Sequence, residues 1–208
     1  MLGMIKKDLF MIRNNLKNLL FVIFIYFFYT MMFDNDMSFI LLFMTLMICI
    51  STFSHDDYNN WHAFAAALPQ GKINNVKSKY ITTITLIVFA TIISIIFTFI
   101  ISNFKTTIIF SDVISSISSY LFAMFILVSI LFPLLFKFGA DARIIMLILG
   151  MGIVVVILLL KKFVNISIPT NIITFLDSYH LIIFLILSII FIGVSYLISK
   201  KIYLKKEF

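Results

Sequence analysis

The sequence has few charged residues and a single cysteine. Of its 208 residues, 12% are charged and 62% are hydrophobic, and the mean hydropathy is +1.16. A soluble domain is roughly one quarter charged and half apolar, so this chain lacks the polar surface that a water-soluble fold needs. The lone Cys49 excludes an intramolecular disulfide. The composition therefore predicts an integral membrane protein whose side chains mostly face lipid or one another.

Ionisable residues are also missing from the middle of the long apolar runs. Proton-coupled and ion-coupled carriers need titratable or ion-binding groups at membrane depth. Intramembrane proteases of the metal or aspartyl type need ligands or paired carboxylates there. We therefore expect neither a self-powered carrier nor a membrane enzyme, and no catalytic residue in this chain.

A nucleotide-binding loop is absent as well. The one Gly-Lys pair, Gly71-Lys72, is followed by Ile73 instead of Ser or Thr, and Ala66 stands where the first P-loop glycine would be. His55 and His62 are seven residues apart, two turns along a helix, which is too far for a compact pair of metal ligands. We therefore expect no cofactor and no metal site in this chain.

Six apolar runs are long enough to cross a bilayer at about 1.5 Å per helical residue. The runs are continuously apolar and do not alternate, which argues against a membrane β-barrel. A cleaved signal peptide is not expected, because the first run is long and Asp34-Asn35-Asp36 follows it. We predict one all-α transmembrane domain over residues 1–208, with spans at about residues 16–33, 38–53, 80–101, 117–136, 144–160 and 181–198.

Lysine and arginine predict the orientation of these six spans. With the N-terminus in the cytoplasm, 13 of these residues fall on the inner side and 3, namely Lys105, Lys161 and Lys162, on the outer side. The sequence thus predicts a multi-pass cell-membrane protein with both termini in the cytoplasm. The net charge of +7 lies at the ends of apolar runs rather than in one patch, so we expect no nucleic-acid partner.

The first 15 residues have the pattern of an amphipathic helix. Apolar residues recur every three or four positions, and the lysines and Arg13 mostly lie off that stripe. This predicts a helix along the inner leaflet with its cations near anionic head groups, although the segment could also be a simple positive flank of the first span. The apolar positions are Leu2, Ile5, Leu9, Ile12, Leu16 and Leu19.

The segment at residues 54–79 is the most informative cytoplasmic part. Ser54 and Asp57 resemble a capping box that would start a short helix, and Pro69 with Gly71 would end it before the third span. Aromatic and apolar residues would then share one face of this helix. The face fits two interpretations, an interfacial helix of the aromatic belt or a docking helix for a soluble partner. Its residues are Tyr58, Trp61, Ala65 and Leu68.

The order of these segments resembles the membrane subunit of an ABC type-2 permease. The order is an amphipathic helix, two spans, a cytoplasmic helix and four more spans. Residues 53–64 carry an acidic pair before Asn59-Asn60-Trp61, and Leu68-Pro69 and residues 76–80 (Val-Lys-Ser-Lys-Tyr) follow. Small permeases of Gram-positive bacteria have a similar series, and the chain resembles the permease subunits of the staphylococcal phenol-soluble modulin exporter. Further similar positions are Pro133, Lys137-Phe-Gly139 and Ala142-Arg143.

The resemblance implies a function for the cytoplasmic helix. Residues 56–67 would be a coupling helix that fits a groove on a separate ABC ATPase subunit, and that subunit would bind ATP and Mg²⁺. The family also implies a dimer with a second permease copy or a paralogue, and amphipathic, cytolytic peptides as the exported substrate. The expected ATPase contacts are Asp56, Asp57, Tyr58, Trp61, His62 and Phe64.

One alternative from a different class stays open. The chain could be a membrane immunity or sensor protein that confers tolerance of antimicrobial peptides without transport. A neighbouring reading frame with a Walker A motif would favour transport over this alternative.

Overall fold

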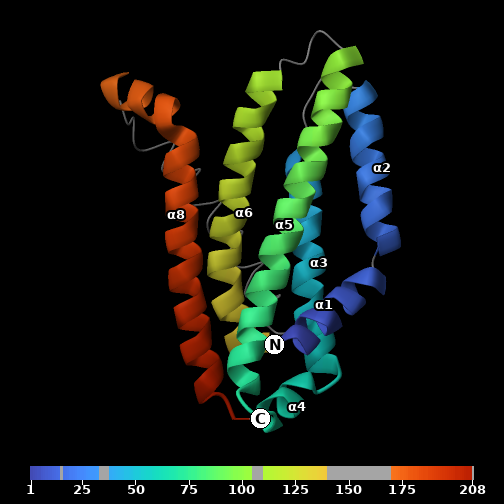
Figure 1. Ribbon diagram of the computed structural model, residues 1–208, viewed down its shortest axis with the longest axis vertical. Helices are drawn as coiled ribbons and strands as arrows, with labels where there is room; N and C mark the ends of the chain where they lie inside the picture. The colour runs from blue at the N-terminus through green and yellow to red at the C-terminus, as the bar shows by residue number, and fades with distance from the viewer. Residues whose placement is uncertain (15, 33–37, 105–109, 140–169, 208) are drawn as a thin grey trace, which may run out of the picture.

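The computed structural model describes residues 1–14, 16–32, 38–104, 110–139 and 170–207, and all regular secondary structure in these residues is helical. Figure 1 shows long helices that run side by side and shorter ones at their lower end. In chain order they are α1 (Leu2–Asn14), α2 (Leu16–Met32), α3 (Ser38–Tyr58), α4 (Trp61–Ala67), α5 (Gly71–Phe104), α6 (Phe110–Phe138) and α8 (Thr170–Lys205).

Four of the helices are long and apolar enough to cross a membrane. They contain the predicted spans at residues 38–53, 80–101, 117–136 and 181–198, within α3, α5, α6 and α8 respectively. The run predicted at residues 16–33 forms α2, which has 17 residues. The run at residues 144–160 lies outside the described residues. The prediction of an all-helical membrane protein is confirmed, whereas the count of six spans stays a prediction.

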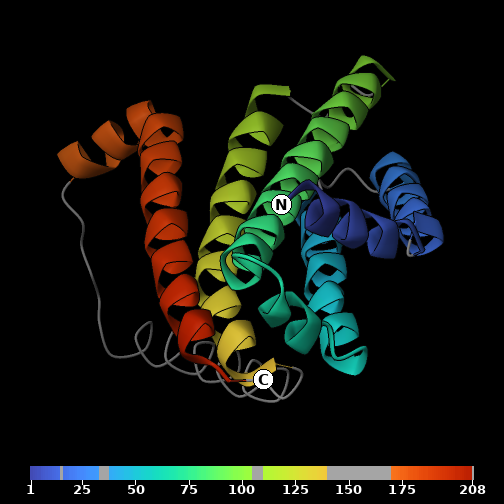
Figure 2. The same ribbon diagram turned by 60° about the horizontal axis from the view of Figure 1, so that its bottom comes forward.

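Helix α1 lies crosswise at the lower end of the long helices and packs on α5 and α3 (Figures 1 and 2). The face that contacts the bundle carries Met4, Asp8 and Ile12, which are spaced by one helical turn and are buried. Leu2 and Leu9, from the predicted apolar stripe, are exposed. The helix itself was therefore predicted correctly, but the face that attaches it to the protein contains an aspartate and, of Met4, Asp8 and Ile12, has only Ile12 in common with the predicted apolar stripe.

The predicted start of the cytoplasmic helix is wrong. Helix α3 continues without a break through Ser54 and Asp57 to Tyr58, so these two residues lie inside a helix and do not cap one. The chain breaks only at Asn60, whose φ of 51° is left-handed, a conformation that asparagine tolerates better than most residues. The expected single helix over residues 56–67 is thus the last turn of α3 followed by α4. Consequently, the residues expected on one face do not share a helix.

The predicted break at Pro69 and Gly71 is confirmed. Leu68 is extended with ψ of 146°, as expected for a residue that precedes proline. Gly71 then begins α5, and its N–H donates to the Leu68 carbonyl oxygen at 2.9 Å. A Cβ on Gly71 would overlap the Ala65 carbonyl oxygen, so only glycine allows α4 and α5 to approach this closely.

An aromatic cluster fastens the long helices together at their lower end. The Phe53 ring of α3 lies 5.1 Å from the rings of both Phe132 and Phe136 of α6. The Tyr80 ring of α5 is 4.9 Å from Phe132, and the Tyr203 ring of α8 is 5.2 Å from Phe136. All four pairs are edge-to-face, the arrangement that aromatic rings favour. The cluster therefore joins α3, α5, α6 and α8 at this end of the bundle.

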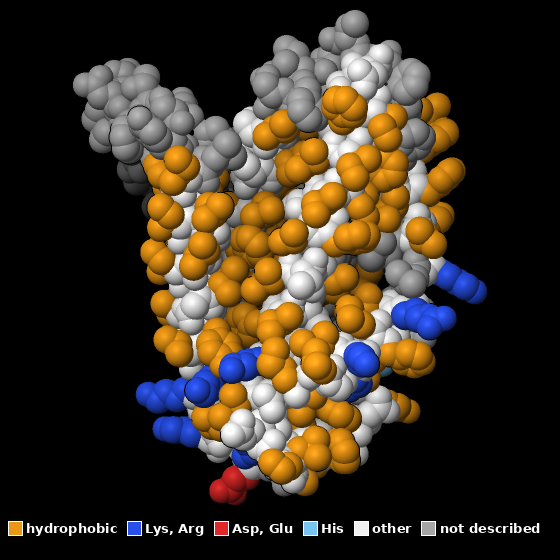
Figure 3. All heavy atoms as spheres, in the orientation of Figure 1, with side chains coloured by type: hydrophobic (Ala, Val, Ile, Leu, Met, Phe, Trp, Pro, Cys, Tyr) orange, Lys and Arg blue, Asp and Glu red, His pale blue; other side chains and the backbone are white. Residues whose placement is uncertain are grey.

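The outer surface of the long helices is apolar. Large side chains such as Phe28, Phe99 and Ile189 are more than half exposed. Figure 3 shows hydrophobic side chains over most of the visible face, while Lys and Arg gather toward the lower end, near both termini. A water-soluble protein would not leave so large an apolar surface uncovered, and lipid is the natural solvent for it.

Candidate functional site

The candidate site is the lower end of the bundle, where α4 packs on the ends of α3 and α5 and contacts α8 and the crosswise helix α1 through side chains (Figure 2). Two polar networks join these elements. The first is a cluster of buried ion pairs, and the second is a chain of hydrogen bonds that includes α4 itself.

The ion-pair cluster is centred on Lys79 of α5, which is 1% exposed. Its Nζ lies 2.9 Å from Oδ1 of Asp8 in α1, 2.7 Å from Oδ2 of Asp56 in α3, and 2.9 Å from Oγ1 of Thr52. Asp8 and Asp56 are both fully buried. A buried charge is strongly unfavourable unless it is paired, so these contacts require α1, α3 and α5 to stay together.

Lys7 completes this cluster and connects it to α4. Its Nζ donates to Oδ1 of Asp56 at 2.6 Å and lies 3.2 Å from Oδ1 of Asp8. It also lies 4.2 Å from the ring centroid of Trp61, a cation–π distance. Burial and the positive charge of Lys79 lower the pKa of Lys7, and the two carboxylates oppose that shift. Two ammonium groups thus face two carboxylates, and the cluster is electrically balanced.

The second network runs from Trp61 to Asp57 through three intermediate side chains. Trp61 Nε1 donates to Oδ1 of Asn75 at 3.2 Å, and Asn75 Nδ2 donates to the Tyr203 hydroxyl at 3.0 Å. The Tyr203 hydroxyl lies 2.7 Å from His62 Nδ1, and His62 Nε2 lies 3.0 Å from Oδ1 of Asp57. Because the Asp57 carboxylate can only accept, a neutral His62 ring carries its proton on Nε2, and Nδ1 then accepts from the Tyr203 hydroxyl.

The electrostatics agree with a neutral His62 ring. Burial lowers the pKa of His62 below its ordinary value, although the Asp57 carboxylate acts in the opposite direction. A neutral ring can accept from Tyr203 and donate to Asp57 at the same time, whereas a protonated ring could only donate. The network is therefore directed from Trp61 toward Asp57.

The ends of α6 and α8 close the site from the side opposite α1. Gly139, directly after α6, has φ of 61°, and a Cβ there would come within 2.8 Å of Oδ2 of Asp57. Lys206, directly after α8, lies with its Nζ 3.4 Å from the carbonyl oxygens of Phe136 and Lys137 at the end of α6, where the helix dipole favours a cation. Lys72 Nζ in turn donates to the Lys206 carbonyl oxygen at 2.7 Å.

The structure divides the six expected ATPase contacts into two groups. Tyr58 is 87% exposed and Phe64 is 56% exposed, so both point away from the protein. Trp61, His62 and Asp57 are half-buried in the hydrogen-bond network. The Asp56 carboxylate is fully buried in ion pairs and does not reach the surface of this chain. Contact with an ATPase stays a prediction for all six residues.

The partners of these residues were not predicted from the sequence. Lys7, Asp8, Asn75 and Tyr203 were not assigned to the site, and Lys79 was noted only within the series at residues 76–80, although each makes a contact that fixes the site. The available signal was Asp8, an acidic residue at helical spacing from Met4 and Ile12 in an otherwise basic segment. Its partner Lys79 is 71 residues away, and a single sequence does not reveal a pairing over that distance.

The described residues bring no three His, Cys, Asp or Glu side chains together in a way that could hold a metal ion. His55, considered with His62 as a possible ligand, is exposed near the end of α3. The arrangement is thus suited to holding helices in place and presenting a surface.

Comparison with known proteins gives the site its context. No curated protein and no solved structure matches the chain. A family model described as "ABC-2 family transporter protein" matches residues 3–204, which is nearly the whole sequence. The apolar helices described above agree with this match, and the chain belongs to the ABC-2 family of transporter proteins.

Proposed function

We propose that this chain is the permease subunit of an ABC exporter and that α4, with the last turn of α3, docks on a separate ATPase subunit. Members of the ABC-2 family are non-catalytic transmembrane subunits that work with an ABC ATPase. In this proposal the ATPase holds ATP and Mg²⁺, and the present chain supplies the docking surface and the membrane path.

The observation that carries the proposal is the two-sided character of this short segment. Tyr58 and Phe64 are exposed apolar side chains at one end of a membrane protein, and exposed aromatic residues are common anchors of protein interfaces. The opposite side, with His62 and Asp56, is held by hydrogen bonds and ion pairs. Because these contacts already hold the aromatic surface in place, binding a partner would cost little additional ordering of the segment.

The same contacts would transmit a movement of α4 to the membrane helices. Helix α3 runs directly into the docking segment, and α5 continues unbroken over 34 residues from Gly71. Lys79 and Asp56 tie the two helices together, and Asp8 adds α1. A displacement of α4 would therefore move α3 and α5 together, because separating them would leave buried charges unpaired.

The orientation in this proposal places the docking segment and both termini in the cytoplasm. Its support is the excess of Lys and Arg on that side of the predicted spans, 13 against 3. The lower end of the structure, where these residues gather on the visible face, is also the end that carries α4 (Figures 1 and 3).

Amphipathic peptides are the proposed substrate, and a second permease copy or a paralogue completes the path. The support is the sequence resemblance over residues 53–80 to small peptide-exporting permeases of Gram-positive bacteria. The alternative, an immunity or sensor protein that does not transport, makes a different prediction: cells would gain peptide tolerance without any ATP-dependent efflux of labelled peptide.

The experiment that tests docking is the double substitution Tyr58→Ala with Phe64→Ala. Both side chains are exposed, so we expect the variant to fold and to keep its thermal stability. We expect at least a tenfold loss of ATPase copurified from the membrane, and a parallel loss of ATP-dependent peptide efflux. Phe28→Ala, at an exposed position on α2, is the matched control and should retain both. Normal copurification by the double variant would overturn the docking role.

A further inference from the structure

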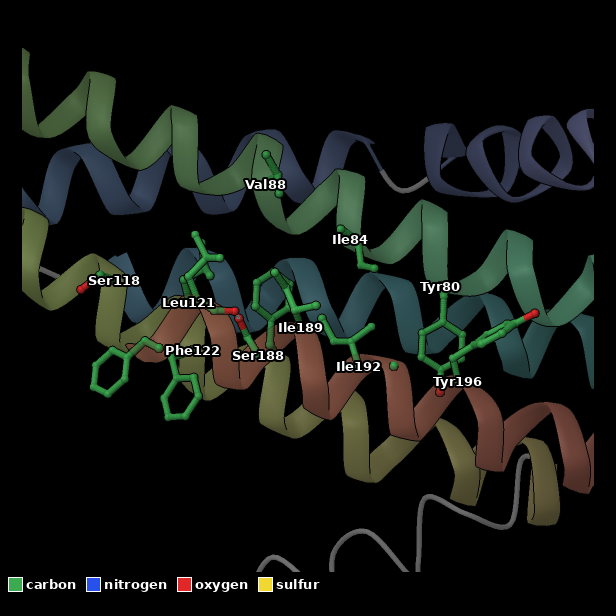
Figure 4. Close-up of a pocket in the computed structure, with 14 residues that line it drawn as sticks. Tyr80, Ile84, Val88, Ser118, Leu121, Phe122, Ser188, Ile189, Ile192 and Tyr196 are labelled. Atoms are coloured by element: carbon green, nitrogen blue, oxygen red, sulfur yellow. Dashed lines mark hydrogen bonds between the residues drawn. The ribbon is translucent and has the colours of Figure 1, made fainter. Parts of the chain in front are cut away.

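Helices α5, α6 and α8 enclose an open groove of about 710 Å³ that faces outward along the apolar part of the bundle (Figure 4). Its walls are aliphatic and aromatic, with Ile84 from α5, Leu121 and Phe125 from α6, and Ile189 and Ile192 from α8. In Figure 3 it appears as a hydrophobic recess between α8 and α5. The volume is within the range of small-molecule sites.

Of the four hydroxyl groups that line the groove, those of Tyr80, Ser118 and Ser188 have hydrogen-bond partners. Tyr80 Oη lies 2.6 Å from Ser195 Oγ and 2.8 Å from Ser199 Oγ. Ser188 donates to the Leu185 carbonyl at 2.9 Å, and Ser118 donates to the Ser115 carbonyl at 2.6 Å. An extended peptide in this groove would leave its backbone N–H and C=O groups unsatisfied, at a cost of several kcal/mol each. A hydrocarbon chain has no such groups.

Two lysines stand at the lower end of this apolar groove. Lys77 precedes Tyr80 by three residues and Ile84 by seven, and Lys200 follows Tyr196 by four residues and Gly193 by seven, so each lies on the groove-facing side of its helix. Neither makes an ion pair within the described part of the chain. Figure 3 shows Lys or Arg side chains at the foot of the recess.

We propose that this groove binds an anionic phospholipid, with an acyl chain along α5, α6 and α8 and the phosphate between Lys77 and Lys200. An apolar slot that ends in two unpaired cations is complementary to a molecule with a hydrocarbon tail and an anionic head. Cationic pockets between membrane helices on the cytoplasmic side bind such head groups. Assignment to the inner leaflet rests on the cytoplasmic orientation proposed above.

A second copy of this chain fits the groove less well on grounds of charge. In a two-fold symmetric contact each copy presents the same patch, so Lys77 and Lys200 of one protomer would approach the same lysines of its partner. Like charges in a low-dielectric contact repel strongly. An anionic lipid instead neutralises both lysines.

Lipid retention measured by native mass spectrometry tests the proposal. The full chain is extracted in mild detergent from membranes containing equal amounts of phosphatidylglycerol and phosphatidylcholine. We expect the wild type to retain one phosphatidylglycerol in preference to phosphatidylcholine. Lys77→Gln with Lys200→Gln should lower that preference roughly 25-fold, since each lysine contributes about a fivefold effect near a charged lipid. Lys201→Gln with Lys205→Gln removes the same charge at exposed positions and should leave it unchanged.

A second variant tests the tail site separately. A Cβ on Gly193 meets no atom within 4 Å, so Gly193→Leu can fold and its side chain can fill the groove. Val194→Leu is the control, because it adds bulk at a neighbouring exposed position outside the groove. We expect Gly193→Leu alone to lose the bound lipid. Equal retention of both lipids by the wild type would overturn the proposal. So would a Gly193→Leu variant that still retains the lipid, or one that loses its dimer while the amount of bound lipid is unchanged. ATPase copurification through Tyr58 and Phe64 is unaffected by either result, so failure here leaves the docking proposal standing.

Discussion

The charge of Lys79 is compensated by residues from two other helices. Its ammonium group is 1% exposed and lies within 2.9 Å of carboxylate oxygens of both Asp8 and Asp56. Removal of the cation would leave two buried carboxylates to share Lys7 alone. Loss of one partner from a buried pair is far more damaging than replacement of the whole pair by apolar groups.

We therefore expect Lys79→Met to lower the free energy of unfolding by about 3 to 5 kcal/mol. The measurement is thermal unfolding of the purified protein in detergent. Lys201→Met, which removes an exposed lysine near the same end of the protein, should change the midpoint little. Equal midpoints for the two variants would mean that the ion cluster contributes nothing to stability.

His62 gives the site a dependence on pH. Burial lowers the pKa of His62 in the folded state, so the unfolded chain binds a proton first as the pH falls. The stability associated with the neutral ring is complete above the unfolded pKa of about 6.5 and is lost as the pH falls toward the lower folded pKa. Protonation also removes the acceptor for the Tyr203 hydroxyl.

We expect the unfolding midpoint of the wild type to fall as the pH is lowered from 7.5 to 5, and His62→Gln to have a shallower slope over the same range. The exposed His55→Gln serves as control and should follow the wild type. If the unfolding midpoint of His62→Gln fell with pH as steeply as that of the wild type, His62 would not be the group whose titration causes the change.

At the scale of the element, the tight connection between α4 and α5 fixes the angle at which the docking segment leaves the membrane helix. Gly71 makes this connection possible, because any side chain there would collide with the Ala65 carbonyl. We expect Gly71→Ala to destabilise the protein by about 2 kcal/mol through overpacking. It should also weaken ATPase copurification, since α4 must tilt to make room.

Gly193→Ala is the matched control for that substitution. Gly193 lies within α8 and has open space where a Cβ would be placed. The same chemical change should be neutral there or should stabilise by about 0.5 to 1 kcal/mol, because alanine is the better helix former. If Gly71→Ala were equally well tolerated, the close approach of α4 and α5 would be unimportant for stability.

The helices were predictable from the sequence, but the junctions between them were only partly so. Long apolar runs and the Pro69 break are local signals, and the structure agrees with them. The continuation of α3 past Ser54 was missed because a Ser and an Asp at capping-box spacing also occur inside helices, where packing decides. The pairing of Lys79 with Asp8 depends on tertiary structure, which local sequence periodicity does not reveal. The outward aromatic residues of the site were predictable, whereas its buried supports were not.

At the scale of the whole molecule, the orientation in the membrane decides whether α4 can meet a cytoplasmic ATPase. A variant with Cys49→Ser offers a cysteine-free background, and single cysteines can then replace Lys201 or the predicted outer-loop residues Lys105 and Lys162. We expect a membrane-impermeant maleimide to label the positions of Lys105 and Lys162 in intact cells and that of Lys201 only after permeabilisation. Labelling of Lys201→Cys in intact cells would reverse the proposed topology.

The bond between His62 and Tyr203 joins residues that are 141 positions apart. During synthesis, the docking segment emerges long before the last helix that holds it, so its final shape must wait until α8 has been inserted. In the proposed exporter, the last turn of α8 would therefore have to fold before the docking segment reaches its final structure. An ATPase that binds the docking segment only when Tyr203 holds it in place would not bind nascent or truncated permeases. ATP hydrolysis would then be coupled only to chains that have finished folding.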